Sequence, residues 1–397
     1  GAVADAPVAA APVAGAPVVE KKKPAEFSYK GHFQFRTETA SNNQGIKNAS
    51  VAEKSFSRLR TDLTFAPNKN LSFNLSPQAT KGFGADEAVP TTSTATSGGT
   101  THTYLYFYEA NINYTLFDFM SFKLGRQELA YGDHLIIGSL PWANNARSFD
   151  ALKFKFKYDF GWTDVFYSEI SDNATSADPA DDTNFAGVYN SFSLGNYFNP
   201  FDFYALHKKD NKNKIEVNTI GFRILGGGDN YFYRTENGFQ SGDDASQANL
   251  EVGLKYNGYS ASLEYATAGS GYDQHYPTAH KFLGYADVLK RNNVNHVALH
   301  LNGNFVSWFS AGLDFHAFKR KKVDKAVFNT SPTNPSLGTT GDSDDIGTEA
   351  DLVLNLIASD GVKLQLGNAL FSPGQYMKDN GNDQVTNFAY LQLNAAF

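Results

Sequence analysis

The sequence predicts an all-β protein, a transmembrane antiparallel up-and-down β-barrel of about 18 strands. Three observations predict this fold: apolar residues recur at every second position, tight turns alternate with long polar loops, and the sequence ends on an aromatic residue. Because successive side chains of a strand point to opposite faces, the period of two gives each strand one apolar and one polar face. A barrel with lipid outside and water inside requires that division.

The last strand shows the alternation clearly. From Leu391 to Phe397, every second residue is apolar, with Gln392 and Asn394 between them. A terminal aromatic residue is the usual signal for the machinery that inserts outer-membrane barrels. We therefore expect Phe397 to be an insertion signal and the barrel-assembly machinery to be a partner.

The same alternation recurs from residue 27 onward. Clear examples are residues 27–36, 58–65, 71–75, 104–116, 247–256 and 349–356. Residues 162–171 and 185–208 leave open which side chains face inward. The segments add up to about eighteen strands of roughly ten residues, the length that a tilted membrane strand needs.

The connections fall into two classes. Short turns are expected at 67–70, 117–119, 159–161, 226–229, 257–258, 302–304 and 359–361, and long polar loops at 40–54, 81–101, 131–147, 172–184, 269–291, 319–346 and 372–384. Outer-membrane barrels have this sidedness, with short turns in the periplasm. A soluble β-sandwich would not separate its connections in this way, and a β-propeller would repeat every 40–50 residues or so.

Composition agrees with a barrel. Hydrophobic residues make up 41% of the 397 residues, and no run reaches the roughly 18 apolar residues of a spanning helix. The 33 Phe and 21 Tyr suit interfacial girdles. The absence of cysteine excludes disulfides and thiolate metal sites, and a net charge of −7 argues against nucleic-acid binding.

Residues 1–26 differ from the rest. Ala-Pro-Val repeats at 6–8, 11–13 and 16–18, before a run of lysines at 21–23. Such proline density favours an extended chain. We expect residues 1–26 to be a flexible periplasmic tail, left after removal of a signal peptide, and residues 27–397 to form the barrel. Contact of the lysines with cell wall or lipid is the alternative.

A barrel of about eighteen strands leaves an aqueous lumen unless loops plug it. The polar positions offer the cations Lys30, Arg36, Arg58, Arg60, Lys123, Lys153, Lys155, Lys157, Arg223, Arg234, Lys255 and Lys363, and the anions Glu38, Asp62, Glu109, Glu236, Glu251, Glu264, Asp314, Glu349 and Asp351. Cations concentrate on early strands and anions on late ones. The hypothesis is a transverse field that orients solutes and sets ion preference; the alternative is that these charges only solvate a wet wall.

No metal, cofactor or catalytic site is expected. His296 and His300 are four residues apart on one strand, about 13 Å, which is too far to chelate one ion, and His316 lies on the next strand near Asp314. The acidic segments 341–345 and 379–383 do not complete a calcium loop; they are solvated or bridge lipopolysaccharide through divalent ions. No nucleophile elbow is present, so we expect no enzyme.

Two passages go beyond the general barrel pattern. Residues 125–133, which lead into 142–150, and residues 276–287, followed by 291–293, resemble the alginate-export family of outer-membrane proteins, and the strand order is similar over residues 27–397. The resemblance implies a monomeric eighteen-stranded barrel, with a trimer as the alternative, whose loops enter a cationic lumen that passes an anionic polysaccharide outward.

The same resemblance implies that Arg126 and Arg147 lie at a constriction. On strict alternation Arg126 would face lipid beside Leu124, so an inward position requires a bulge at Gly125. Arg147 could instead pair with Asp150 and fix a loop.

The expected lining is mixed, and a polyanion would meet repulsion at Glu251, Glu349 and Asp351. The sequence therefore favours a porin-like channel in the outer membrane of a Gram-negative bacterium, for passive diffusion of small hydrophilic solutes with anion or saccharide preference. Its expected surroundings are membrane lipid and lipopolysaccharide. The alternatives are an exporter of an anionic exopolysaccharide such as alginate, and an abundant structural barrel.

Overall fold

The computed structural model describes residues 25–42, 52–83, 104–171, 182–195, 197–330, 336–339 and 341–397. In this part of the chain, one 18-stranded antiparallel sheet closes on itself through the pairing of β1 with β18. The predicted barrel is therefore confirmed. Residues 1–24 of the tail expected over residues 1–26 lie outside the described residues, and the barrel begins at Glu26.

The strands follow one another around the ring in sequence order. They are β1 Glu26–Ser41, β2 Ala52–Asn68, β3 Leu71–Gly82, β4 Tyr104–Phe117, β5 Met120–Gln127, β6 Phe149–Tyr158, β7 Gly161–Ser171, β8 Thr183–Phe192, β9 Phe201–Asp210, β10 Ile215–Gly227, β11 Tyr231–Gln240, β12 Ser246–Tyr256, β13 Tyr259–Ala268, β14 Val294–Val306, β15 Phe309–Arg320, β16 Asp345–Ser359, β17 Val362–Pro373 and β18 Thr386–Ala396. A 3-10 turn, Ala279–Lys281, and one short helix, α1 Gln375–Asp379, lie in connections. Within the described residues, no helix has the length and apolar character needed to cross a membrane.

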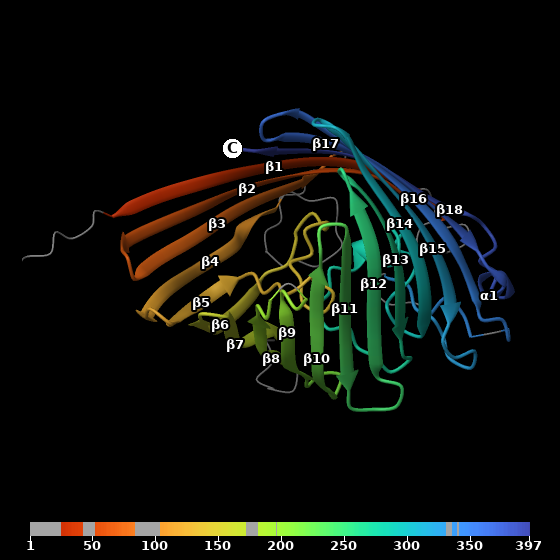
Figure 1. The fold of residues 1–397 in the computed structure, drawn as a ribbon, viewed down its shortest axis with the longest axis horizontal. Helices are drawn as coiled ribbons and strands as arrows, with labels where there is room; N and C mark the ends of the chain where they lie inside the picture. The colour runs from red at the N-terminus through yellow and green to blue at the C-terminus, as the bar shows by residue number, and fades with distance from the viewer. Residues whose placement is uncertain are drawn as a thin grey trace, which may run out of the picture.

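The seam between the first and last strands is fully paired. Residues 32–41 of β1 run antiparallel to residues 387–396 of β18, and Figure 1 shows the red β1 beside the blue strands of the other end of the chain. Beyond the ladder, Gly31 N donates to Phe397 O at 2.7 Å and Phe397 N donates to Gly31 O at 3.0 Å. The sheet therefore has no open edge at this seam.

Polar side chains of the strands point into the barrel and apolar side chains point outward, the reverse of the arrangement in a water-soluble protein. On β12, Asn249 and Glu251 are buried, whereas Leu250 and Val252, which alternate with them, are 48% and 50% exposed. The same alternation places buried polar residues inside and exposed Leu, Phe, Tyr and Val outside on most strands. An apolar outer belt of this extent is stable only where lipid covers it.

Most predicted turns are present, but one is misplaced. Asn302–Asn304 was expected to turn, whereas it lies within β14, and the turn falls at Ser307–Trp308. The apolar pair Phe305 and Val306 continues the strand past the glycine, with a register shift between Asn304 and Val306. The connection between β8 and β9, residues 193–200, is longer than the other turns at the short-turn end of the barrel. The connection between β9 and β10, residues 211–214, is shorter than the loops at the long-loop end. The first connection lies within residues 185–208, where the inward face was left open, and the second follows shortly after them.

The lumen contains a second core. Two connections, which we call the first inner loop (residues 128–148) and the second inner loop (residues 269–293), lie inside the ring of strands (Figure 1). Ile137 of the first loop forms a parallel bridge with Tyr276 of the second. Leu135, Ile136 and Ile137 are 1–3% exposed. The predicted wide lumen is therefore narrowed by packed chain.

Candidate functional site

The first inner loop is attached to the wall formed by β1 and β2. Arg36 Nη1 donates to Trp142 O at 2.8 Å, and Arg58 Nη1 donates to Ala143 O at 3.2 Å and Pro141 O at 3.3 Å. The Arg36 guanidinium also stacks 3.7 Å from the centroid of the Trp142 ring. Two of the predicted lining arginines therefore hold the loop rather than standing free in water.

The same loop is attached at the opposite wall by a carboxylate. Asp133 Oδ1 accepts from Arg223 Nη2 at 3.0 Å, and Asp133 Oδ2 accepts from Arg234 Nη1 at 3.2 Å. Burial alone would raise the pKa of Asp133, but Arg223 and then Arg234 hold this pKa below its ordinary value. Because β10 and β11 lie half-way round the ring from β1 and β2, the first inner loop crosses the lumen.

The second inner loop is attached to β9, β11 and β16. Asp273 pairs with Lys208 of β9, and Gln240 of β11 donates to the Asp273 carbonyl at 2.6 Å. Toward its other end, Ala286 N donates to Glu349 Oε1 at 2.8 Å and Tyr285 N donates to an oxygen of Asp351 at 3.1 Å. Glu349 and Asp351 are thus acceptors for loop backbone.

A cavity of about 340 Å³ lies between the two inner loops and the β1–β2 and β17–β18 wall. It is lined by His32, Gln34, Arg58, Pro141, Trp142, Thr278, His280, Lys281, Tyr285, Gln365, Gln392 and Asn394. Two cations, four side-chain amides and a Trp142–His280 stack at 3.9 Å are concentrated here. Cationic groups bind anions, and amides with aromatic faces suit sugar hydroxyls and rings.

Most predicted lining residues belong to the inward series. These are Lys30, Arg36, Arg58, Arg60, Glu109, Lys123, Lys153, Lys155, Arg223, Arg234, Glu251, Asp314, Glu349 and Asp351. Many charges are paired inside the lumen: Asp164 accepts from both Lys153 and Lys155 at 3.0–3.1 Å, and Arg234 contacts Glu251 and Glu264. Glu251 on β12 lies across the ring from the basic members on β1–β6, whereas Glu349 and Asp351 on β16 lie only three strands from β1.

Arg126 departs from the expected position. It lies on the outward face, 38% exposed, and its Nη1 is 3.0 Å from Asp150 Oδ2 on the same face of β6. Gly125 does have a positive φ of 114°, but the register of β5 against β4 and β6 is unbroken there. Strict alternation therefore holds, and Arg126 does not line the lumen.

Arg147 is a loop-fixing residue, although not through Asp150. Its Nη1 donates to Pro277 O at 3.1 Å and to Gly138 O at 3.3 Å. Burial lowers the pKa of Arg147 to about 10. The side chain joins the two inner loops to each other.

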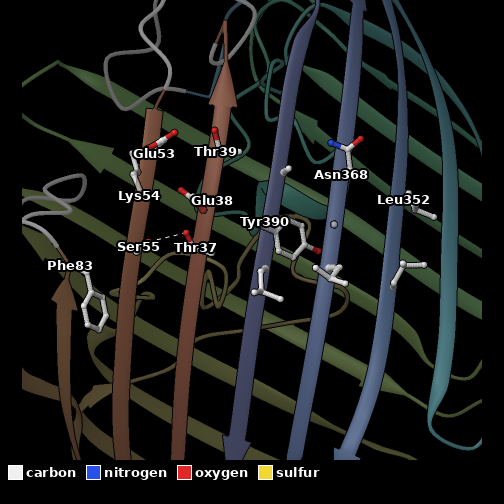
Figure 2. Close-up of a pocket in the computed structure, with 15 residues that line it drawn as sticks. Thr37, Glu38, Thr39, Glu53, Lys54, Ser55, Phe83, Leu352, Asn368 and Tyr390 are labelled. Atoms are coloured by element: carbon white, nitrogen blue, oxygen red, sulfur yellow. Dashed lines mark hydrogen bonds between the residues drawn. The ribbon is translucent and has the colours of Figure 1, made fainter.

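Two cavities, of about 720 and 630 Å³, lie on the outward face of the sheet. Figure 2 shows one of about 720 Å³, whose lining includes Leu352, Leu354, Leu366 and Leu391. Thr37 and Ser55, which share a 2.8 Å hydrogen bond drawn there, belong to the same outward series. This groove faces lipid and is not part of the channel.

Several cavity residues were not among the predicted lining residues. The alternation alone could have identified His32, Gln34 and Gln392 as lumen-facing residues, because they alternate with outward Phe33 and Leu391. Trp142 and His280 lie within the family-like passages but in loops, where the sequence carries no periodic signal.

Acid should weaken docking of the second inner loop through His275. Burial lowers the pKa of His275 to about 4, with Asp273 raising it and Lys208 lowering it. Docking of the loop therefore favours the neutral form of His275 over the protonated form. The pKa of histidine in the unfolded chain is 6.5, so this contribution to stability is fully present above pH 6.5 and is lost as the pH falls from 6.5 to 4. The loss is up to about 3 kcal/mol.

The measurement is the urea midpoint of unfolding at pH 7.5 and at pH 4.5, for the native chain and for His275→Gln. We expect the variant to show the smaller pH dependence. An equal shift in both proteins would contradict this assignment.

Comparison with known proteins agrees with the geometry. Residues 91–390 match the model of the family described as Alginate export. No curated protein matches the sequence.

Solved structures share the fold at low sequence identity. OccAB1 of Acinetobacter baumannii has a TM-score of 0.65 at 12% identity, covering 93% of this chain and 96% of that one. OccAB4 of the same organism has a TM-score of 0.64 at 11% identity, covering 95% and 99%. OccK8 (OprE) of Pseudomonas aeruginosa has a TM-score of 0.62 at 8% identity, covering 94% and 98%.

Proposed function

The chain belongs to the alginate export family, and from that premise we propose that it is an outer-membrane channel for small hydrophilic solutes, with a preference for anions or saccharides. The chain would carry out no catalytic step. Its short turns would lie on the periplasmic side of the membrane, together with the N-terminal tail of residues 1–26. The chain would act as a monomer, as its resemblance to the family implies, with a trimer as the alternative.

The observation that carries the proposal is the cavity between the inner loops. Arg58 and Lys281 supply positive charge, while Gln34, Gln365 and Gln392 supply amide donors and acceptors. Trp142 and Tyr285 add aromatic surface. A solute that crosses the lumen near this wall would meet cationic, hydrogen-bonding and stacking groups together.

Export of a polyanion is the second candidate, because the family's description names alginate export. Both inner loops are attached at more than one wall, so a polymer would require their displacement. Acidic Glu251, Glu349 and Asp351 face the same lumen. These features favour small solutes over a polymer.

Liposome swelling with sugars of graded size separates the candidates. We expect swelling that falls as solute size increases. Liposomes that do not swell with the smallest sugar, but pass anionic oligosaccharide once periplasmic partners are added, would reject the diffusion channel in favour of export.

Ion preference is tested by reversal potentials in a salt gradient, with Arg58→Ala/Arg60→Ala as the variant. We expect anion preference in the native channel and a fall of about fivefold per removed charge, the equivalent of about 1 kcal/mol at 4 Å in water. Arg126→Ala is the matched control, because this arginine faces outward. No selectivity in the native channel, or no change in the double variant, would reject the transverse field.

A further inference from the structure

Strands β15 and β16 place two carboxylates opposite each other on the lumen face. Asp314 is the register partner of Asp351, and His316 lies two residues further along β15 on the same face. Ligand atoms of these three side chains all lie within 4.8 Å of one another. Like charges directly opposite each other destabilise a sheet, and a cation bound between them would relieve that repulsion.

Two polar atoms in this cluster lack a hydrogen-bond partner among the described residues. They are Asp351 Oδ1 and His316 Nε2. The two side chains are 0% and 3% exposed, and His316 Nε2 lies 3.3 Å from Asp351 Oδ2. Buried polar atoms without a partner are uncommon in native proteins, and a bound ion is one of their standard explanations.

We propose that Asp314, His316 and Asp351 bind a divalent first-row transition-metal ion, with Zn²⁺ as the representative. Zinc takes imidazole nitrogen and carboxylate oxygen at about 2.0–2.2 Å, which places two tetrahedral ligands about 3.4 Å apart. The 3.3 Å separation of His316 Nε2 and Asp351 Oδ2 fits that geometry. Calcium and magnesium favour six or more oxygen ligands, so a nitrogen ligand with two carboxylates selects against them.

The surrounding hydrogen bonds orient the ligands. His316 Nδ1 lies 2.8 Å from His296 Nε2. When His316 Nδ1–H donates to His296, the lone pair of His316 Nε2 is free for the metal. Asp314 Oδ1 lies 2.7 Å from His300 Nδ1. The sequence spacing ruled out chelation by two histidines of one strand; the cluster instead forms across two strands.

The site also contacts the second inner loop. Asp351 accepts the Tyr285 N–H, and Tyr285 lines the cavity between the inner loops. A bound ion would therefore fix the carboxylate that holds this loop.

Zinc binding to the full chain in detergent, measured by equilibrium dialysis, tests the proposal independently of channel activity. We expect one saturable Zn²⁺ per chain that excess Ca²⁺ or Mg²⁺ does not displace. His316→Gln and Asp351→Asn should each weaken binding by more than about tenfold, because loss of a residue that only hydrogen-bonds to a metal ligand already lowers metal affinity about 10–100-fold. His207→Gln is the matched control, since His207 faces outward and contacts Asn218.

Absence of saturable binding by the native chain would overturn the proposal. So would unchanged affinity in both site variants, or an equal loss in His207→Gln. Heat-dependent gel mobility reports whether each variant folds. Should either buried variant fail to fold, Asp314→Asn replaces it, because Asp314 is 19% exposed.

Discussion

Gly284→Ala should open the channel. Gly284 has a φ of +84°, and a Cβ there would lie 2.3 Å from Glu349 Oε1. That oxygen accepts the Ala286 N–H, so making room for the methyl group breaks one of the bonds that dock the second inner loop. Backbone strain in the left-handed region adds about 1–3 kcal/mol.

A combined penalty of about 2–3 kcal/mol shifts the ratio of docked to released loop about 30–150-fold. In planar bilayers we expect frequent large-conductance openings, and in liposomes a higher size limit for sugars. The matched control is Gly195→Ala, which shares the φ of +84° but has nothing within 4 Å of the added Cβ. Identical traces from the two variants would show that the second inner loop does not restrict the pore.

The barrel could be predicted from the sequence because every strand has one face toward lipid and the other toward water. On β12 and β16 apolar side chains face lipid and polar side chains face the lumen. The alternation of Leu250 with Glu251, and of Leu352 with Asp351, therefore indicates which side chains lie outside and which inside. The failure at Asn302–Asn304 is instructive. Local turn propensity was outweighed by pairing of Phe309 with Val306, which extends β14 to its bulge.

Only part of the candidate site could be predicted from the sequence. Inward parity identified Arg58 as a lining residue, but not that it would hold the carbonyls of Pro141 and Ala143. Those contacts join residues more than 80 positions apart and depend on where a non-periodic loop folds. Arg126 shows the complementary error: a family resemblance suggested a constriction, whereas unbroken alternation already placed the side chain outward.

Arg234→Met should lower the free energy of unfolding and should also change ion preference. Arg234 contacts Asp133, Glu251 and Glu264, and the two glutamates are 9% and 2% exposed. Removing one partner of a buried ion pair costs about 3–5 kcal/mol. Since Arg234 is itself 24% exposed, solvent screening reduces the expected loss to about 2–3 kcal/mol.

The readouts are the urea midpoint and the reversal potential. The midpoint should fall, and the reversal potential should move toward cation preference because Glu251 and Glu264 lose their counter-charge. Asp133→Asn should recover part of the stability in the double variant, with a coupling of about 0.5–3 kcal/mol. Arg126→Met, which breaks an exposed pair, should cost no more than about 1 kcal/mol. If the two methionine variants unfold alike, the lumen network does not hold the first inner loop across the barrel, and the constriction must rest on its apolar packing alone.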